Sequence, residues 1–192
     1  IVVAKQNNAL VISALDDAAA RIGLAIGQPL ANARAICPDI EVFDADEMAD
    51  ARTLNGIADW CDRFTPLVAL DPQHGLMLDI TGCTHLFGGE RAMLDDILSR
   101  FFHQGFDVRA GLAATPGAAW AAARFSGDRI VPSGEEEALL APLPLAALRI
   151  EPATRASLES VGLRAAGAVM AAPRAPLARR FGASLLLRLD QA

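Results

Sequence analysis

The segment Arg63–Glu90, which reads RFTPLVALDPQHGLMLDITGCTHLFGGE, is the most informative part of the sequence about the fold. It contains two apolar runs, residues 67–70 and 76–80, separated by the turn-forming residues DPQHG. Runs of this length, bounded by proline, glycine and aspartate, are typical of two paired strands joined by a tight connection. The segment therefore predicts a β-hairpin.

Amphipathic helices are predicted on both sides of this hairpin. Apolar residues recur with the spacing i, i+3, i+4, i+7 in residues 54–61 and again in residues 94–101, which gives each segment one apolar face. Residues 106–112 then alternate between apolar and polar or small, as a strand does. Thr115 and Pro116 supply an N-cap and a first-turn proline for another helix. This order favours an α+β fold, with an antiparallel or mixed sheet and helices on one face.

The N-terminal part predicts a second hairpin with two short helices. Residues 1–4 and 10–14 are β-prone and are separated by Gln-Asn-Asn, a turn-forming cluster. A short helix is expected over residues 16–22, because Gly23 stands where a helix end favours a left-handed residue. Another short helix is expected to begin near Pro29 and to stop before Cys37-Pro38.

The chain is predicted to have three parts. Strand signals vanish beyond Pro132, and short amphipathic helices punctuated by proline and glycine follow. We therefore divide the chain into residues 1–46, a small helical subdomain on a hairpin, residues 47–132, the sheet-containing part, and residues 133–192, an all-helical part.

Composition limits the classes of function. The chain is 53% hydrophobic with a net charge of −6, and residues 1–148 carry 10 basic and 20 acidic groups against 7 and 3 in residues 149–192. An acidic body releases few counterions, so any contact with DNA should be weak and should come from the C-terminal segment. We expect no membrane span, no signal peptide and no disulfide among the three cysteines, which together indicate a cytoplasmic protein.

Three segments carry a family resemblance. Residues 63–90 resemble the palm hairpin of Y-family DNA polymerases, and more closely that of the ImuB-type polymerase-like proteins of bacterial mutasomes. Residues 114–124, ATPGAAWAAAR, resemble the next palm helix of that group, and residues 23–30, GLAIGQPL, resemble its fingers motif. The resemblance implies that 1–46 is a remnant of the first palm strands with the fingers, that 47–132 is the palm and that 133–192 is the thumb. It also implies that the little finger and the first palm strand lie outside these residues.

The resemblance implies a two-metal site that this sequence has lost. Y-family enzymes hold two Mg²⁺ ions with an aspartate on the first palm strand and an Asp-Glu pair that leads into the hairpin's second strand. Matching Leu78-Asp79 to the end of the family motif places that pair on His74 and Gly75. Since Mg²⁺ requires oxygen ligands, we predict no metal, no cofactor and no catalytic residue.

The residues with which the family binds the incoming nucleotide are also replaced in this sequence. The family's tyrosine and arginine that hold the incoming triphosphate match Asp17 and Ala20, and residues 125–128 replace an expected Lys-Pro. A carboxylate beside phosphates in a partly dry pocket is unfavourable by a few kcal/mol, in order of magnitude. We therefore predict no nucleotide-binding residue.

The thumb motif is altered as well. The family's Gly-X-Gly turn, which presents backbone amides to a DNA phosphate, matches Arg149-Ile150-Glu151, so the close approach that glycine permits is lost. Weak DNA contact is assigned to five arginines of this region: Arg149, Arg155, Arg174, Arg179 and Arg180.

These features predict a noncatalytic scaffold subunit for SOS-induced, error-prone translesion synthesis and DNA repair. The partners that the resemblance implies are a RecA-like protein of the ImuA type, an error-prone DnaE-like polymerase, and the sliding clamp through regions outside this chain. Two alternatives stay open: an active, divergent Y-family polymerase whose carboxylates include Asp71 and Asp79, and a weak DNA-binding module that uses the arginines of residues 149–192.

Other readings of single residues are disfavoured. A zinc site lacks the usual CxxC or HxxxH spacing, although the candidate ligands would be His74, Cys83 and His85 with Asp71 or Asp79. Asp79 is expected to cap the turn at Thr81-Gly82. Trp60 and Trp120 are expected to pack against apolar neighbours and not against bases.

Overall fold

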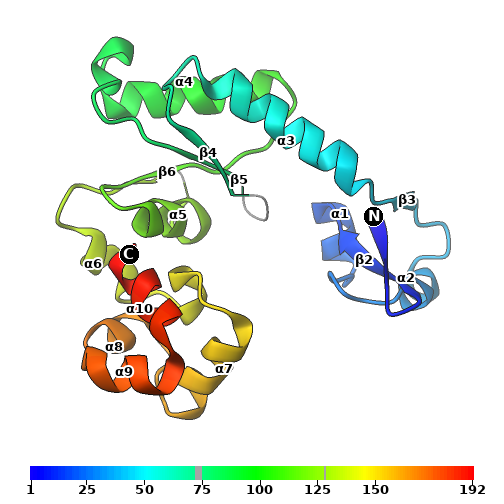
Figure 1. Ribbon diagram of the computed structural model, residues 1–192. Coiled ribbons are helices and arrows are strands. Elements are labelled where there is room, and N and C mark those ends of the chain that lie inside the picture. The colour runs from blue at the N-terminus through cyan, green and yellow to red at the C-terminus, as the bar shows by residue number, and fades with distance from the viewer. Residues whose placement is uncertain (72–74, 128) are drawn as a thin grey trace. The chain divides into compact units, whose positions relative to one another are not determined.

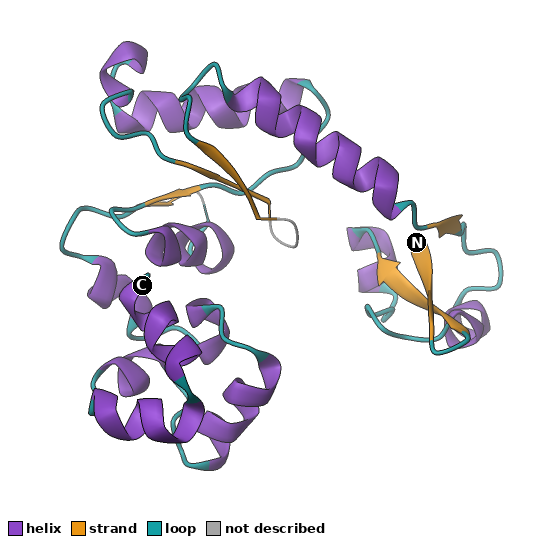
Figure 2. Ribbon diagram, viewed as in Figure 1, coloured by secondary structure: helices purple, strands orange, loops and turns teal. Residues whose placement is uncertain are grey.

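The computed structural model describes residues 1–71, 75–127 and 129–192 (Figure 1). The chain forms two compact units, Ile1–Leu76 and Met77–Ala192. Strands are short and helices dominate (Figure 2). The predicted α+β class is confirmed, but the strands within the described residues form three small sheets of three, two and two strands instead of one larger sheet.

The first unit begins with the predicted hairpin. Strands β1 (Val2–Gln6) and β2 (Ala9–Ala14) pair antiparallel. Asn7 and Asn8 join them with positive φ values of 44° and 68°, which a type I′ turn requires and asparagine tolerates. A two-residue strand, β3 (Phe43–Asp44), lies parallel to β1 on its other edge.

Three helices complete the first unit: α1 (Asp17–Arg21), α2 (Leu30–Ile36) and α3 (Glu47–Cys61). Aspartates cap two of them, because the Asp16 carboxylate accepts from the Ala19 amide and the Asp46 carboxylate from the Ala49 amide, each at 2.8 Å. Such caps satisfy backbone donors that the helix leaves open. A small core holds the hairpin and the first two helices together, and its buried members are Ile12, Ala19, Leu24 and Ala33.

The hairpin predicted within residues 63–90 is present in the structure. Strands β4 (Val68–Asp71) and β5 (Gly75–Leu78) are neighbours in a two-stranded sheet. Residues 72–74, and therefore His74, lie outside the described residues. The division between the two units falls inside β5.

In the second unit, the prediction of a strand over residues 106–112 was wrong for most of this range. Only β6 (Gly111–Leu112) forms, parallel to β7 (Arg129–Ile130). Period-two alternation reports which side chains face inward, whereas a ladder also requires a neighbouring strand. The predicted helix before it is present as α4 (Glu90–His103), and a 3₁₀ turn, η1 (Thr84–Phe87), precedes α4.

Helix α5 (Pro116–Phe125) is the centre of one core of the second unit. Its predicted cap is confirmed, since the Thr115 hydroxyl accepts from the Ala118 amide at 3.3 Å. The helix packs against α6 (Glu136–Leu140) and the 3₁₀ turn η2 (Leu145–Leu148). The buried residues of this core are Ala118, Ala121, Ala122, Val131, Leu139, Leu140 and Ala147.

The C-terminal segment is helical, as predicted. It continues with α7 (Pro152–Ser160), α8 (Ala166–Met170), α9 (Arg174–Phe181) and α10 (Ala183–Asp190). These helices share a second core, whose buried members are Leu145, Leu148, Leu158, Ala166, Val169, Leu177 and Leu185. Both cores include residues of η2. The three-part division of the chain stays a prediction.

The end of α10 is fixed to the start of α5. The Gly117 amide donates to the Gln191 carbonyl at 2.7 Å, and the Thr115 hydroxyl donates to the Ala192 carbonyl at 2.6 Å. These bonds satisfy donors at one helix start with acceptors at another helix end. No helix in the described ranges combines the length and the hydropathy that crossing a bilayer requires.

Candidate nucleotide and nucleic-acid sites

The second strand of the β4–β5 hairpin starts at a residue without a side chain. Gly75 opens β5 with φ of 127°, in the range that favours glycine. A Cβ built at this position would meet no atom within 4 Å, so space does not exclude a side chain here. The sequence simply offers no carboxylate at Gly75, and the preceding His74 is outside the described residues.

Asp79 is engaged in a turn, as predicted. The Thr81 amide donates to its carboxylate at 2.9 Å, and the Cys83 amide donates to the Ile80 carbonyl at 2.9 Å. Hydrogen bonds from the side chain and the backbone of Thr81 lower the pKa of the Asp79 carboxyl below its ordinary value. A carboxylate held by its own turn is a structural cap, because its charge already has donors.

We expect the substitution Thr81→Ala to raise the pKa of Asp79 toward its ordinary value. The folded state lowers this pKa, so the stabilisation is present at neutral pH and is lost as the pH falls through the folded pKa. A carboxyl-detected NMR titration measures the shift, and Thr84→Ala serves as the control that leaves it unchanged. Equal Asp79 titrations in the parent and in Thr81→Ala would contradict the capping assignment.

The active-polymerase alternative requires carboxylates placed around a shared metal position. Asp71 is half-buried at the end of β4, whereas Asp79 is exposed. Across residues 1–71, 75–127 and 129–192, no three His, Cys, Asp or Glu side chains are placed to hold one ion. The disfavoured zinc site has no such group in these ranges either, and the Cys83 thiol donates to the Thr81 carbonyl at 3.8 Å.

The residues that match the triphosphate grip lie on α1. Asp17 is its first residue and Ala20 lies within it, and both are exposed. A carboxylate in the first turn interacts favourably with the helix dipole, which gives Asp17 a structural role. Of the residues that replace the expected Lys-Pro, Phe125 ends α5 and is 39% exposed, and Asp128 lies outside the described residues.

The turn that matches Gly-X-Gly carries an arginine, an isoleucine and a glutamate in this chain. Arg149 follows η2 with φ of 56°, the left-handed conformation that usually falls to glycine. Glu151 is the N-cap of α7 and Pro152 is its first residue. The start of α7 therefore presents a carboxylate and lacks one amide donor, and both changes disfavour a phosphate at a helix start.

Five arginines were predicted to bind DNA, and three of them interact with another side chain of this chain. The Arg149 guanidinium lies 5.4 Å from the centre of the Trp120 ring, and that of Arg180 lies 5.5 Å from the centre of the Phe181 ring. Arg174 forms an ion pair with Asp190. Arg155 is half-buried on α7 and Arg179 is exposed on α9.

The packing of Trp120 is the feature that sequence reasoning found only in part. The expectation that Trp120 packs against apolar neighbours named no arginine, whereas the Arg124 guanidinium lies 5.1 Å from the ring centre. The contact with Arg149, across 29 positions of sequence, had no local signal. Trp120 and Trp60 are half-buried and contact neighbouring aromatic rings, at 6.1 Å to Phe125 and 5.5 Å to Phe64 between ring centres.

Comparison with known sequences identifies relatives among DNA-processing proteins. A family model described as the impB/mucB/samB family matches residues 1–124. The protein ImuB of Caulobacter vibrioides is 52% identical over 172 residues, which cover 89% of this chain and 38% of that protein. DNA polymerase IV 2 of Mesorhizobium japonicum is 29% identical over 178 residues, which cover 90% of this chain and 43% of that protein. The chain thus spans about two fifths of these relatives.

Solved structures share the fold. An insertion ternary complex of Dbh DNA polymerase superposes with a TM-score of 0.80 over 100% of this chain and 59% of that chain, at 16% identity. A Y-family DNA polymerase chimera of Dbh and Dpo4 gives a TM-score of 0.74 over 98% of this chain, at 15% identity. Identities this low establish the architecture alone: the chain has a Y-family polymerase-like fold with small sheets.

Proposed function

Because this chain belongs to the impB/mucB/samB family and has a Y-family polymerase-like fold, we propose that it is a noncatalytic scaffold in SOS-induced, error-prone translesion DNA synthesis and repair. One observation carries the proposal. The positions that match the family's Asp-Glu pair are His74 and Gly75.

The chemistry of nucleotide addition explains why this replacement matters. Two divalent ions must stand close together to stabilise the attacking and the leaving oxygens of an in-line displacement. Carboxylates supply the oxygen ligands and the negative charge that hold such ions. Gly75 has no side chain, and Asp79 already accepts a hydrogen bond from its own turn.

The fingers support the same proposal. Asp17 stands where the family places a contact to the triphosphate, and its exposed carboxylate would repel the phosphates. Ala20 at the other matched position carries no hydrogen-bonding side chain. The first unit also carries the whole net charge, with five basic and eleven acidic residues, which makes it a poor surface for nucleotides.

We assign the parts of the fold by the same resemblance. Residues 1–46 would be a remnant of the first palm strands with the fingers, residues 47–132 the palm and residues 133–192 a helical thumb with a degenerate helix-hairpin-helix. DNA contact through the thumb would be weak, since Arg149 and Arg174 contact other side chains of the chain and Glu151 places a carboxylate at the start of α7.

The proposed partners are those that the resemblance to ImuB-type proteins implies, and the 52% identity to ImuB supports that resemblance. In this proposal the chain acts in the cytoplasm and connects a RecA-like protein of the ImuA type with an error-prone DnaE-like polymerase. The DnaE-like polymerase would perform the chemistry. The sliding clamp would be bound through regions outside these residues.

Primer extension tests the proposal against the active-polymerase alternative. With Mg²⁺ or Mn²⁺, we expect no nucleotide incorporation above background by this chain or by a protein of the relatives' length that contains it. A catalytically active Y-family polymerase provides the positive control. Extension that the substitution Asp79→Asn abolishes would establish a divergent enzyme and contradict the scaffold proposal.

A further inference from the structure

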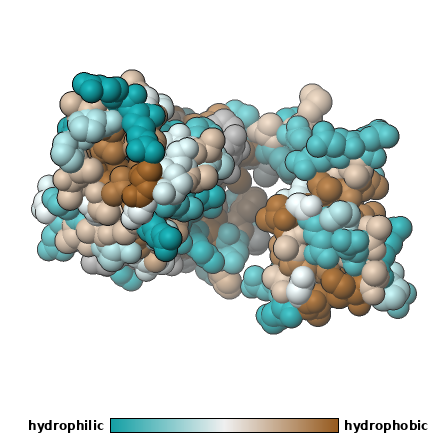
Figure 3. Space-filling view, turned by 90° about the horizontal axis from the view of Figure 1, so that it is seen from below, coloured by the Kyte–Doolittle hydropathy of each residue, from teal (hydrophilic) through white to brown (hydrophobic). Residues whose placement is uncertain are grey.

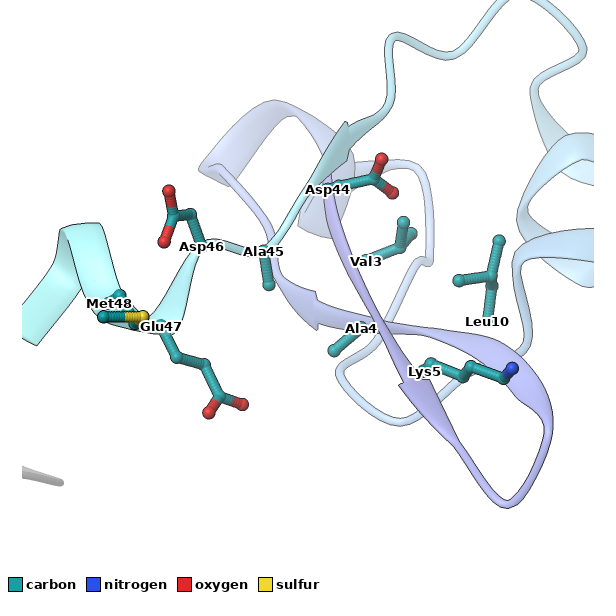
Figure 4. Close-up of a pocket in the computed structure, with 9 residues that line it drawn as sticks. All are labelled: Val3, Ala4, Lys5, Leu10, Asp44, Ala45, Asp46, Glu47 and Met48. Atoms are coloured by element: carbon teal, nitrogen blue, oxygen red, sulfur yellow. The ribbon is translucent and has the colours of Figure 1, made fainter.

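A pocket of about 610 Å³ opens in the first unit where β3 ends and α3 begins (Figure 4). Asp46, Glu47 and Met48 lie on one side of it, and Lys5 and Leu10 lie on the other. All of its lining residues belong to the unit Ile1–Leu76. Neither the palm hairpin nor the residues that match the triphosphate grip take part in it.

The pocket includes an open stretch of sheet edge. Strand β3 pairs with Val2 and Val3 only, and the last bond of this edge runs from the Ala45 amide to the Val3 carbonyl at 2.8 Å. Backbone groups of a strand alternate between its two edges, so the amide and the carbonyl of Lys5 point to the same edge as those of Val3. An open edge of this kind offers a donor and an acceptor to another extended chain.

Apolar side chains flank that edge. Leu10 is 44% exposed and Met48 is 73% exposed, and the buried Val3, at 1% exposure, also lines the pocket. Exposed leucine and methionine side chains favour binding of a partner, because covering them removes apolar surface from water.

Carboxylates lie around the apolar side chains of the pocket, and they favour a positively charged binding partner. Asp44, Asp46 and Glu47 face a single basic residue, Lys5, in the lining. The unit as a whole has a net charge of −6, from five basic and eleven acidic residues, whereas the second unit has twelve of each. Its field therefore attracts cationic groups and repels phosphates.

Other occupants fit this surface less well. A nucleic acid would bring phosphates toward three carboxylates. A metal ion is not supported, because no ligand group of three exists in the part of the chain that the structure describes. A second copy of the chain would have to bind through a different, basic surface, and such a head-to-tail contact does not close unless it forms a ring.

We propose that this pocket binds an extended, basic segment of a partner protein, in which arginine or lysine alternates with apolar residues. The segment would add to the edge of β1 at Lys5, place its apolar side chains on Leu10 and Met48, and pair its cations with Asp44 and Glu47. The inference does not depend on the loss of catalysis, because it rests on the surface of the first unit alone.

Fluorescence anisotropy with a short labelled peptide of alternating leucine and arginine tests the proposal. We expect saturable binding of this peptide to the intact chain and none of the matching leucine-glutamate peptide. The double substitution D44N/E47Q should weaken binding about tenfold, as the loss of two ion pairs in a partly desolvated site implies. Met48→Ser should also weaken binding while leaving the charge unchanged. Asp46 is kept, because it caps α3.

A matched pair of carboxylates separates this site from general attraction by an acidic surface. Asp17 and Asp59 are exposed in the same unit, and D17N/D59N removes the same charge outside the pocket. Less than a twofold change in D17N/D59N supports the proposal. Equal weakening by both double substitutions would overturn it, as would self-association of the chain that D44N/E47Q abolishes, because the occupant would then be another copy.

Discussion

Replacing Gly111 with valine is expected to lower the free energy of unfolding of the second unit by about 3 kcal/mol or more. Gly111 lies in β6 against helix α5. A Cβ at this position would stand 2.4 Å from the Ala119 carbonyl oxygen and 2.5 Å from the Ala123 nitrogen. Both are backbone atoms of a helix, so they cannot move aside as a flexible side chain could.

Urea denaturation followed by Trp120 fluorescence, in a Trp60→Phe background, measures this effect in the second unit alone. The control Gly56→Ala adds a methyl group in α3, where no heavy atom lies within 4 Å of the new carbon. That change should stabilise the first unit by up to about 1 kcal/mol through helix propensity and leave the Trp120 transition unchanged. A Gly111→Val protein that unfolds at the parent's urea concentration would contradict the packing of β6 on α5.

Leu158→Ala is expected to cost about 2 to 5 kcal/mol. Leu158 is fully buried on α7 in the core that joins α7 to the helices after it. Its removal deletes apolar contacts and leaves a cavity that rigid neighbours fill only in part. Because α7 follows the Arg149 turn, this core also fixes the proposed thumb hairpin.

The matched control is Leu187→Ala on α10. Leu187 is 57% exposed, so the same chemical change should cost less than about 1 kcal/mol. Urea denaturation with the same probe compares the two variants. Similar midpoints for Leu158→Ala and Leu187→Ala would show that the second core contributes little to stability.

Local chemistry made much of the fold predictable. The Asn7-Asn8 turn, the Asp16 cap and the Thr115-Pro116 helix start each act through atoms a few residues apart, and a sequence displays such neighbours directly. The strand predicted over residues 106–112 was too long because strand formation depends on a partner far along the chain. Its actual partner, β7, begins at Arg129.

The candidate sites were likewise predictable where the contacts are local in sequence and unpredictable where they are not. The capping role of Asp79 was predictable, because its donor is two residues away. The contact between Arg149 and Trp120 was not, and it gives an intramolecular role to an arginine first assigned to DNA. The pocket beside β1 was also missed, since it exists only because Val2 and Phe43 pair across 41 positions of sequence.

The loss of the two-metal site can be tested by measuring whether the chain binds paired divalent ions. The chain is titrated with Mn²⁺ in the presence of a nonhydrolysable nucleoside triphosphate, and paramagnetic broadening of the amide signals of residues 75–79 is followed by NMR. We expect no saturable broadening at these residues, since Gly75 has no side chain to bind a metal and the Asp79 carboxylate accepts a hydrogen bond from the Thr81 amide. Saturable broadening that requires the triphosphate and disappears in Asp79→Asn would contradict this expectation.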